Sequence, residues 1–358
     1  MDVRTSESDI VAPARGAAAH YLDVVRAIGD DTFWPLLMLA NTNLFLWHVD
    51  AFKRDTDPVP EFAEQFAQAA RFLAAAKASG VAGGHFSPVR AAEVPDASER
   101  FVSTMFSDVW VALTDDVYFD ETRRFIVERF ERNGVDSREL FRDKVVVDAG
   151  CGSGKFAAGI ASLGARKVIG LDIGAKGLEF ARIQASKVPY GDRLEYRYGS
   201  AHELPLPDAS VDMVWSNGVV HLTDNYDGCI REFARVLRPG GTLYLYVNGR
   251  FGLFELLLDT VRQASVRIPR AVFQEYLLSL GINTGRIYWM MCAFYAVYQW
   301  RARREVEALL ASSGFADLRQ LTRGLEIDQI EQVTADVPYA AAKYGEAQLK
   351  YLARRTGG

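Results

Sequence analysis

Asp148 and the glycines at positions 150, 152 and 154 form the segment with the clearest chemical signal in the sequence. Three valines, residues 145–147, precede them and predict a strand buried on both faces. Residues 155–163 have a composition that suits a helix. A glycine-rich turn between a strand and a helix lets backbone approach a ligand closely, and doubly wound α/β sheets bind nucleotides at such turns.

Asp172 is a second acidic residue with informative spacing. It ends a predicted strand, residues 168–172, and lies 22 residues after Gly150. A carboxylate about 20 residues beyond such a turn can accept hydrogen bonds from ribose hydroxyls. A dinucleotide fingerprint would require glycine at position 155, but Lys155 stands there. The pattern therefore indicates a nucleotide-like ligand without matching a dinucleotide site.

Five segments in sequence resemble class I S-adenosylmethionine-dependent methyltransferases. Residues 148–154 resemble the D/E-x-G-x-G-x-G motif of that family, and the four others are residues 168–172, 199–205, 211–217 and 232–241. The resemblance implies an α/β fold with a Rossmann-like, seven-stranded sheet. It also implies that S-adenosyl-L-methionine is the cofactor.

The resemblance further implies which residues contact the cofactor. Asp148 would hold its amino group, the glycines would lie along its methionine and ribose parts, and Ile173 would cover the adenine. Ser200 stands where the family usually has Asp, at the adenine edge. Asn217 would lie near the reacting methyl. The predicted cofactor residues are Tyr118, Asp148, Gly150, Cys151, Gly152, Gly154, Asp172, Ile173, Ser200, Ala201 and Asn217.

An acidic stretch, residues 115–121, precedes the predicted core and contains Tyr118-Phe119. This pair resembles part of the Tyr-Phe-x-x-Tyr element of arginine methyltransferases, although Thr122 replaces the second tyrosine. A guanidinium has five donors and a pKa above 12, so its methylation needs carboxylates that orient it and accept a proton. Asp116, Asp120 and Glu121 are therefore candidate catalytic residues. His221 is a candidate general base because an ordinary histidine titrates near neutral pH.

Two features of protein-arginine methyltransferases are missing. Residues 216–224 contain no glutamate, and a helical pattern replaces the barrel domain expected after the core. The first hypothesis is therefore N-methylation of a small guanidino or amine acceptor, such as free arginine, in natural-product biosynthesis. O- or C-methylation of an aromatic or polyketide-like metabolite is the alternative. A methyltransferase-like binding or scaffold protein is a third possibility.

The hydrophobic pattern divides the chain into five parts. Residues 1–12 are predicted to be a disordered tail, 13–134 a helical region with a loop at 80–95, and 135–250 the core. Residues 251–312 are predicted to be a helical insertion after the fifth strand, and 313–358 to complete the sheet. The helical parts are expected to form a lid over the acceptor, and the aromatic insertion is a possible dimer contact.

Composition restricts the remaining functions. The 358 residues carry a net charge of −5 without a long basic run, which disfavours nucleic-acid binding. The three cysteines have no paired spacing, and no His or Asp cluster has metal-ligand spacing, so no metal is expected. Neither a signal peptide nor a membrane span is recognisable, which favours the cytoplasm. A small-molecule acceptor is the expected partner.

Overall fold

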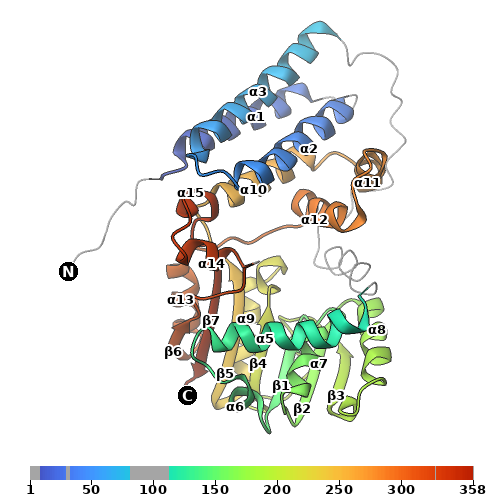
Figure 1. The fold of residues 1–358 in the computed structure, drawn as a ribbon, viewed down its shortest axis with the longest axis vertical. Helices are drawn as coiled ribbons and strands as arrows, with labels where there is room; N and C mark the ends of the chain where they lie inside the picture. The colour runs from blue at the N-terminus through green and yellow to red at the C-terminus, as the bar shows by residue number, and fades with distance from the viewer. Residues whose placement is uncertain (1–8, 30–32, 81–112, 327, 358) are drawn as a thin grey trace, which may run out of the picture. The chain divides into compact units, whose positions relative to one another are not determined.

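A computed structural model describes residues 9–29, 33–80, 113–326 and 328–357 (Figure 1). The chain divides into two compact units. The first contains the described parts of residues 1–97, 250–296 and 336–345, and the second contains those of residues 98–249, 297–335 and 346–358. The chain therefore passes between the units more than once.

The second unit is built on a seven-stranded sheet of order β3-β2-β1-β4-β5-β7-β6. Strand β7 pairs antiparallel with β5 and β6, whereas the pairs among β1 to β5 are parallel. The strands are β1 (Val145–Ala149), β2 (Lys167–Asp172), β3 (Leu194–Tyr198), β4 (Val211–Asn217), β5 (Leu237–Asn248), β6 (Phe315–Gln320) and β7 (Gln348–Arg355). The predicted Rossmann-like methyltransferase sheet is confirmed.

Both faces of this sheet are covered, as its apolar strands require. Val146 and Trp215 pack in one hydrophobic cluster, whereas their neighbours Val147 and Val214 pack in another, because successive strand residues point to opposite faces. The helices of this unit are η3 (Asp116–Glu121, a π-helix), α5 (Thr122–Glu131), α6 (Ser137–Phe141), α7 (Lys155–Ser162), α8 (Ala175–Ala185), η4 (Gly191–Arg193), η5 (Val220–Leu222), α9 (Tyr226–Val236), α13 (Arg303–Ser312) and α14 (Gln329–Thr334).

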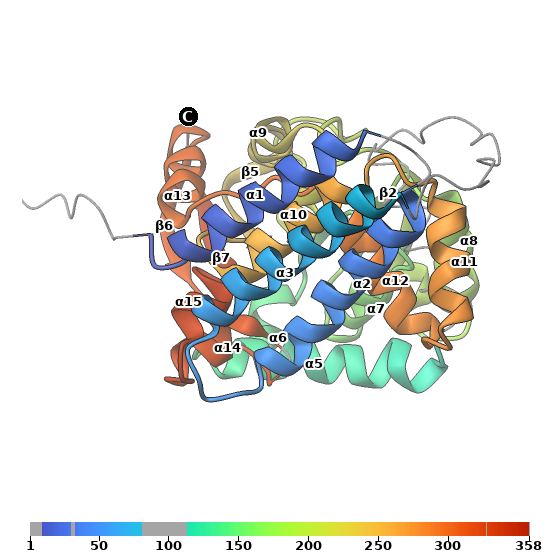
Figure 2. The same ribbon diagram turned by 90° about the horizontal axis from the view of Figure 1, so that it is seen from above.

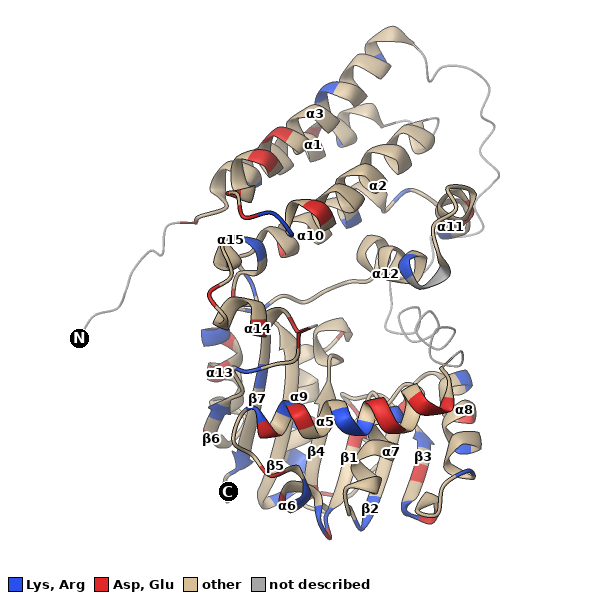
Figure 3. Cartoon of the chain, in the orientation of Figure 1, with Lys and Arg blue, Asp and Glu red and all other residues tan. Residues whose placement is uncertain are grey.

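The first unit is helical. Its elements are α1 (Ala12–Ile28), α2 (Trp34–Ala51), α3 (Pro58–Ser79), α10 (Leu253–Ser265), α11 (Arg270–Ser279), α12 (Thr284–Tyr295) and α15 (Ala340–Tyr344). Helices α1 and α3 run side by side (Figure 2). Helix α2 carries few charged residues (Figure 3), and Phe45 on it packs edge-on against Trp289 and Phe294. Tyr21, Asn41 and Ser265 form a buried chain of hydrogen bonds.

The boundaries of the two compact units differ from the predicted domain boundaries. Helix α13, placed in the predicted insertion, belongs to the sheet unit, because Val306 and Leu310 pack in the core with Phe315. Residues 336–345 belong to the helical unit. Most of the predicted tail (residues 1–8), nearly all of the predicted loop at 80–95 and residues 96–112 of the predicted helical region lie outside the described residues.

Candidate functional site

The glycine turn after β1 follows from backbone geometry. Gly150, Gly152 and Gly154 have φ of 80°, 55° and 80°, in the left-handed region that favours glycine. The Gly150 amide donates to the Leu171 carbonyl at 2.7 Å, which joins the turn to β2. A Cβ built on Gly150 would lie 2.5 Å from both Cγ atoms of Val219. The turn is therefore closed to side chains at this position.

We expect Gly150→Ala to destabilise the protein by about 1–3 kcal/mol through overpacking against Val219, in addition to the backbone strain of a positive φ. Thermal unfolding and calorimetric titration with S-adenosylhomocysteine measure both consequences. Gly240→Ala is a matched control, because Gly240 has φ of 76° and its added Cβ would meet only the end of Arg354 at 3.7 Å. If Gly150→Ala, Val219→Ala regains none of the stability, the clash is not the cause.

Asp148 is the last polar residue before this turn, and its carboxyl group is buried. Its Oδ2 atom has no hydrogen-bond partner among the described residues. Burial, assisted by the negative charge of Asp172, raises the pKa of Asp148 to about 8. A buried carboxyl oxygen without a partner is costly unless a ligand satisfies it, and an ammonium group is the natural complement.

Asp172 is fixed by the backbone on both sides. Its Oδ2 accepts from the Gly152 amide at 2.8 Å, and its Oδ1 accepts from the Gly174 amide at 2.7 Å. Each carboxylate oxygen has two lone pairs, so one oxygen can accept more than one hydrogen bond. Ile173, the next residue, is half-buried. The backbone thus orients Asp172 and the turn as one structure.

The predicted adenine residues follow β3. Ala201 is buried, and the half-buried Ser200 lies 2.9 Å from His202, Oγ to Nδ1. Cys151 is buried in the glycine turn, where burial raises the pKa of its thiol well above the ordinary value. A neutral buried thiol is a poor nucleophile, so Cys151 serves the turn by its small size.

Tyr118 is fully buried, and its hydroxyl donates to the Ser153 carbonyl at 2.7 Å. Its ring packs edge-on against Phe119 and Phe180. The π-helix η3 is therefore joined to the glycine turn through one side chain. This contact orients the turn, whereas direct binding of the cofactor by Tyr118 stays a prediction.

Tyr118→Phe is expected to destabilise the protein by about 1 kcal/mol, because the buried Ser153 carbonyl loses its donor. We also expect a several-fold loss of cofactor affinity as the turn loosens. Chemical denaturation and calorimetry measure these effects. Tyr198→Phe, at a side chain that is 61% exposed, is the control. Equal affinities of the two variants would contradict the orienting function.

Asn217 ends β4, and its side chain is held by two residues that the sequence did not indicate. Arg129 Nη1 donates to Asn217 Oδ1 at 3.0 Å, and the Tyr244 hydroxyl donates to the same atom at 3.2 Å. Arg129 also binds both oxygens of Asp328, at 3.1 and 3.2 Å. Lys350 completes the cluster, 3.2 Å from Asp328 Oδ2. Lys350 lies in an otherwise apolar segment of β7, and this was the sequence signal that could have indicated a buried charged cluster.

His221 is buried beside the carboxyl ends of β4 and β5. Its Nε2 lies 3.3 Å from Asn248 Nδ2, and its ring stacks on Tyr298. The amide nitrogen of Asn248 can donate to Nε2 when the proton of the neutral ring is on Nδ1. Burial lowers the pKa of His221 to about 3. His221 is therefore neutral at pH 7 and a weak base.

The acidic candidates Asp116, Asp120 and Glu121 are all exposed. Glu121 faces Arg124 at 3.9 Å, the neighbouring Asp115 pairs with Lys187 at 2.7 Å, and the hydrogen bonds of Asp116 lower its pKa. Solvated carboxylates of this kind orient a ligand weakly. Their catalytic function stays a prediction, and no contact in the described structure supports it.

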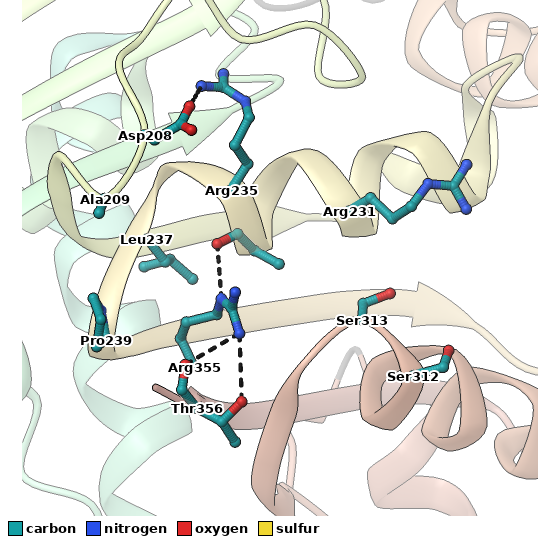
Figure 4. Close-up of a pocket in the computed structure, with 11 residues that line it drawn as sticks. Asp208, Ala209, Arg231, Arg235, Leu237, Pro239, Ser312, Ser313, Arg355 and Thr356 are labelled. Atoms are coloured by element: carbon teal, nitrogen blue, oxygen red, sulfur yellow. Dashed lines mark hydrogen bonds and ion pairs between the residues drawn. The ribbon is translucent and has the colours of Figure 1, made fainter. Parts of the chain in front are cut away.

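A cavity of about 550 Å³ lies at the opposite edge of the sheet, beside the start of β5 and the end of β7 (Figure 4). Two of its arginines, Arg235 and Arg355, are held by neighbouring elements of the fold. Arg355 donates to the carbonyls of Ala234 and Gly314 at 2.9 and 3.1 Å, and Arg235 turns to Asp208. The described residues contain no group of three or more potential metal ligands, and no described helix could cross a membrane.

Residues 147–245 match the family model described as a methyltransferase domain. The match begins at Val147, inside β1, and includes the glycine turn, Asp172 and Asn217. These residues form a class I S-adenosylmethionine-dependent methyltransferase domain. The domain assignment agrees with the sheet order and with the predicted motif at Asp148.

Known proteins match this chain over part of its length. The chain is 43% identical over 147 residues to 27-O-demethylrifamycin SV methyltransferase of Amycolatopsis mediterranei, which covers 38% of this chain and 53% of that protein. It is 40% identical over 158 residues to malonyl-[acyl-carrier protein] O-methyltransferase of Yersinia pestis, covering 44% and 55%. The solved YcgJ protein of Bacillus subtilis aligns with a TM-score of 0.45 and 16% identity, covering 67% and 100%. The chain thus matches about half the length of these curated relatives.

Proposed function

We propose that this protein is an S-adenosylmethionine-dependent O-methyltransferase that acts on a small molecule. The observation that carries the proposal is the buried Asp148 Oδ2 atom, which has no partner among the described residues. It lies two residues before Gly150, where an added Cβ would clash with Val219. S-adenosylmethionine requires a carboxylate that binds its amino group and, beside it, backbone without side chains that it can approach closely.

The cofactor supplies a methyl group already activated on a positively charged sulfur. The protein has to bind and orient the two reactants, and alignment alone can contribute roughly 7–11 kcal/mol to lowering the barrier. We propose that Asp172, which the Gly152 and Gly174 amides hold in place, accepts from the ribose hydroxyls. Ile173, Ser200 and Ala201 are proposed to line the adenine.

Oxygen is favoured as the methyl acceptor for two reasons. Both curated relatives described above have names that place their chemistry at oxygen. The carboxylates predicted to hold a guanidinium, Asp116, Asp120 and Glu121, are exposed. We therefore place O-methylation before the N-methylation of an arginine-like acceptor.

Isothermal titration with S-adenosylmethionine and S-adenosylhomocysteine tests the proposal and its non-catalytic alternative. We expect both to bind, and we expect a methyl group to appear on oxygen when an acceptor is added, as read by mass spectrometry. Asp192→Asn is a suitable control, since Asp192 is an exposed carboxylate of the same unit. No binding of either compound would reject the enzyme and revive a scaffold function.

A further inference from the structure

The amide of Asn217 has a chemically determined orientation. A guanidinium only donates hydrogen bonds, so the Asn217 atom that faces Arg129 Nη1 at 3.0 Å must be the oxygen. The Tyr244 hydroxyl donates to the same oxygen. The amide nitrogen therefore points away from both residues. Its two N–H groups have no partner among the described residues, and the side chain is half-buried, which leaves it accessible to a ligand.

Arg129 is rigidly held, which makes this orientation stable. Its side chain is 1% exposed, binds both oxygens of Asp328 and lies with its guanidinium carbon 4.1 Å from the centre of the Phe125 ring. Tyr244 is also fully buried, and its ring stacks on that of Trp215 with 4.0 Å between the ring centres. Asn217 thus presents two fixed donors at the carboxyl end of β4.

The charges beneath Asn217 favour a negative ligand group. Asn217 pairs with Tyr246 across β4 and β5, and Tyr246 pairs with Lys350 across β5 and β7, so the three form one row. The cluster below contains two basic side chains, Arg129 and Lys350, for one carboxylate, Asp328. A cationic acceptor would meet donors and positive charge here.

Two nearby titratable groups, His221 and Lys350, are poor proton acceptors for a ligand. Burial lowers the pKa of His221 to about 3, so it is a poor base for an alcohol or a phenol. Burial also lowers the pKa of Lys350 to about 7, but Lys350 is fully buried against Asp328 and Gln348. A carboxylic acid, in contrast, ionises in water with a pKa near 4 and needs no base.

We propose that the acceptor group is a carboxylate, that the N–H groups of Asn217 bind it, and that Arg129 is a positioning residue that orients Asn217. This inference rests on the proposed methyltransferase function. One carboxylate oxygen attacks the methyl carbon, a C–O bond forms, and the C–S bond breaks with its electron pair moving to sulfur. The products are a methyl ester and a neutral thioether, and no proton is transferred.

The experiment compares acceptors that differ only in the reacting group. Benzoate, benzyl alcohol, benzylamine and benzamidine form one series, and decanoate, decanol, decylamine and decylguanidine form another. Each is incubated with the protein and methyl-deuterated S-adenosylmethionine, and products are identified by mass spectrometry. We expect methyl esters of the acids as the main products. Methylation of an alcohol, amine or guanidine instead, or of no acid in either series, overturns the inference.

Variants of the Asn217 contact separate positioning from stability. Asn217→Ala is expected to raise the KM for the acid about 10- to 100-fold, the effect of losing hydrogen bonds to a charged group. Asn217→Asp should reverse the preference toward amines. Tyr244→Phe and Arg129→Lys should raise the KM for the acid without changing the affinity for S-adenosylhomocysteine. Arg124→Lys, at an exposed position of α5, should change neither.

Calorimetric titration with S-adenosylhomocysteine separates the carboxylate inference from the proposed methyltransferase function on which it rests. Binding of S-adenosylhomocysteine together with methylation at a group other than carboxylate would reject the carboxylate acceptor and keep the methyltransferase. Absence of that binding would reject the proposed function itself. An unchanged acceptor preference in Asn217→Asp would show that Asn217 does not contact the acceptor.

Discussion

Asp148→Asn is expected to weaken binding of S-adenosylmethionine at least about 30-fold, because removing one member of a buried hydrogen-bonded charge pair costs 2 kcal/mol or more. The same substitution should make the ligand-free protein more stable above pH 7. The wild-type carboxyl is buried without a partner at Oδ2, and the amide carries no charge to desolvate. Loss of binding with a gain of stability identifies a functional residue.

The pH dependence of this effect has a definite sign. The pKa of Asp148 is about 8 in the folded protein. An unfolded aspartate has a pKa of about 3.9, so between these values the folded state holds a proton that the unfolded state has lost. Stability of the ligand-free protein therefore falls as pH rises from 4 to 8. Asp148→Asn should remove this slope.

Cofactor binding should show the opposite trend. The ammonium of the cofactor favours ionised Asp148, so affinity should rise between pH 6 and pH 8 and binding at pH 7 should release close to one proton. Calorimetry in two buffers with different ionisation enthalpies counts that proton. Asp192→Asn should behave as wild type, and an unchanged proton count in Asp148→Asn would contradict the assignment.

The glycine turn and Asp172 could be predicted because their requirements are local. Positive φ at Gly150 and Gly154 requires glycine, and a run of valines before the turn encodes the strand. The resemblance implied a seven-stranded Rossmann-like sheet, and residues 313–358, predicted to complete it, contain β6 and β7. The parts of this site that short segments of sequence determine are therefore the parts that can be predicted.

The support beneath Asn217 could not be predicted in the same way. Arg129 and Asp328 are 199 residues apart, and no spacing rule joins an arginine of α5 to the residue that precedes α14. The catalytic function predicted for the acidic stretch, residues 115–121, gained no support because that prediction relied on local sequence alone. Charge density alone cannot tell a solvated helix from a binding site, and Asp116, Asp120 and Glu121 are exposed.

The function of the helical unit stays a prediction. Its interior is explained by its own packing, with Phe45, Trp289 and Phe294 in mutual contact and Tyr21 bonded to Asn41. These contacts explain why the predicted helical segments fold. They do not identify a lid or a dimer contact, which depend on surfaces that hydrophobic periodicity does not encode.

Asp328→Asn is expected to lower the free energy of unfolding by about 3–5 kcal/mol, because it leaves Arg129 and Lys350 as uncompensated buried cations. Burial alone would raise the pKa of Asp328, but Arg129 and Lys350 outweigh it and hold that pKa below its ordinary value. The wild-type contribution is therefore present above pH 4 and is lost as pH falls through the lower folded pKa. Urea denaturation at several pH values measures it.

Lys350 gives this prediction a second pH dependence. Its pKa is already lowered to about 7, and without Asp328 the pKa should fall further, so Lys350 loses its charge at lower pH in the variant. The penalty of Asp328→Asn should therefore be larger at pH 6 than at pH 9. Adding Lys350→Met should recover part of the stability at pH 6, because the cost of deprotonating Lys350, or of burying its charge without Asp328, is then gone.

Glu326→Gln is the matched control for the Asp328 substitution. Glu326 is an exposed carboxylate two positions away, and its loss should change stability by less than about 0.5 kcal/mol. A penalty for Asp328→Asn that is the same at pH 6 and pH 9, and that Lys350→Met does not reduce, would mean that Asp328 acts through the hydrogen bond it accepts from the Leu325 amide and not by neutralising the buried cations. In that case Arg129 would keep its orientation, and acceptor preference would be unchanged in the variant.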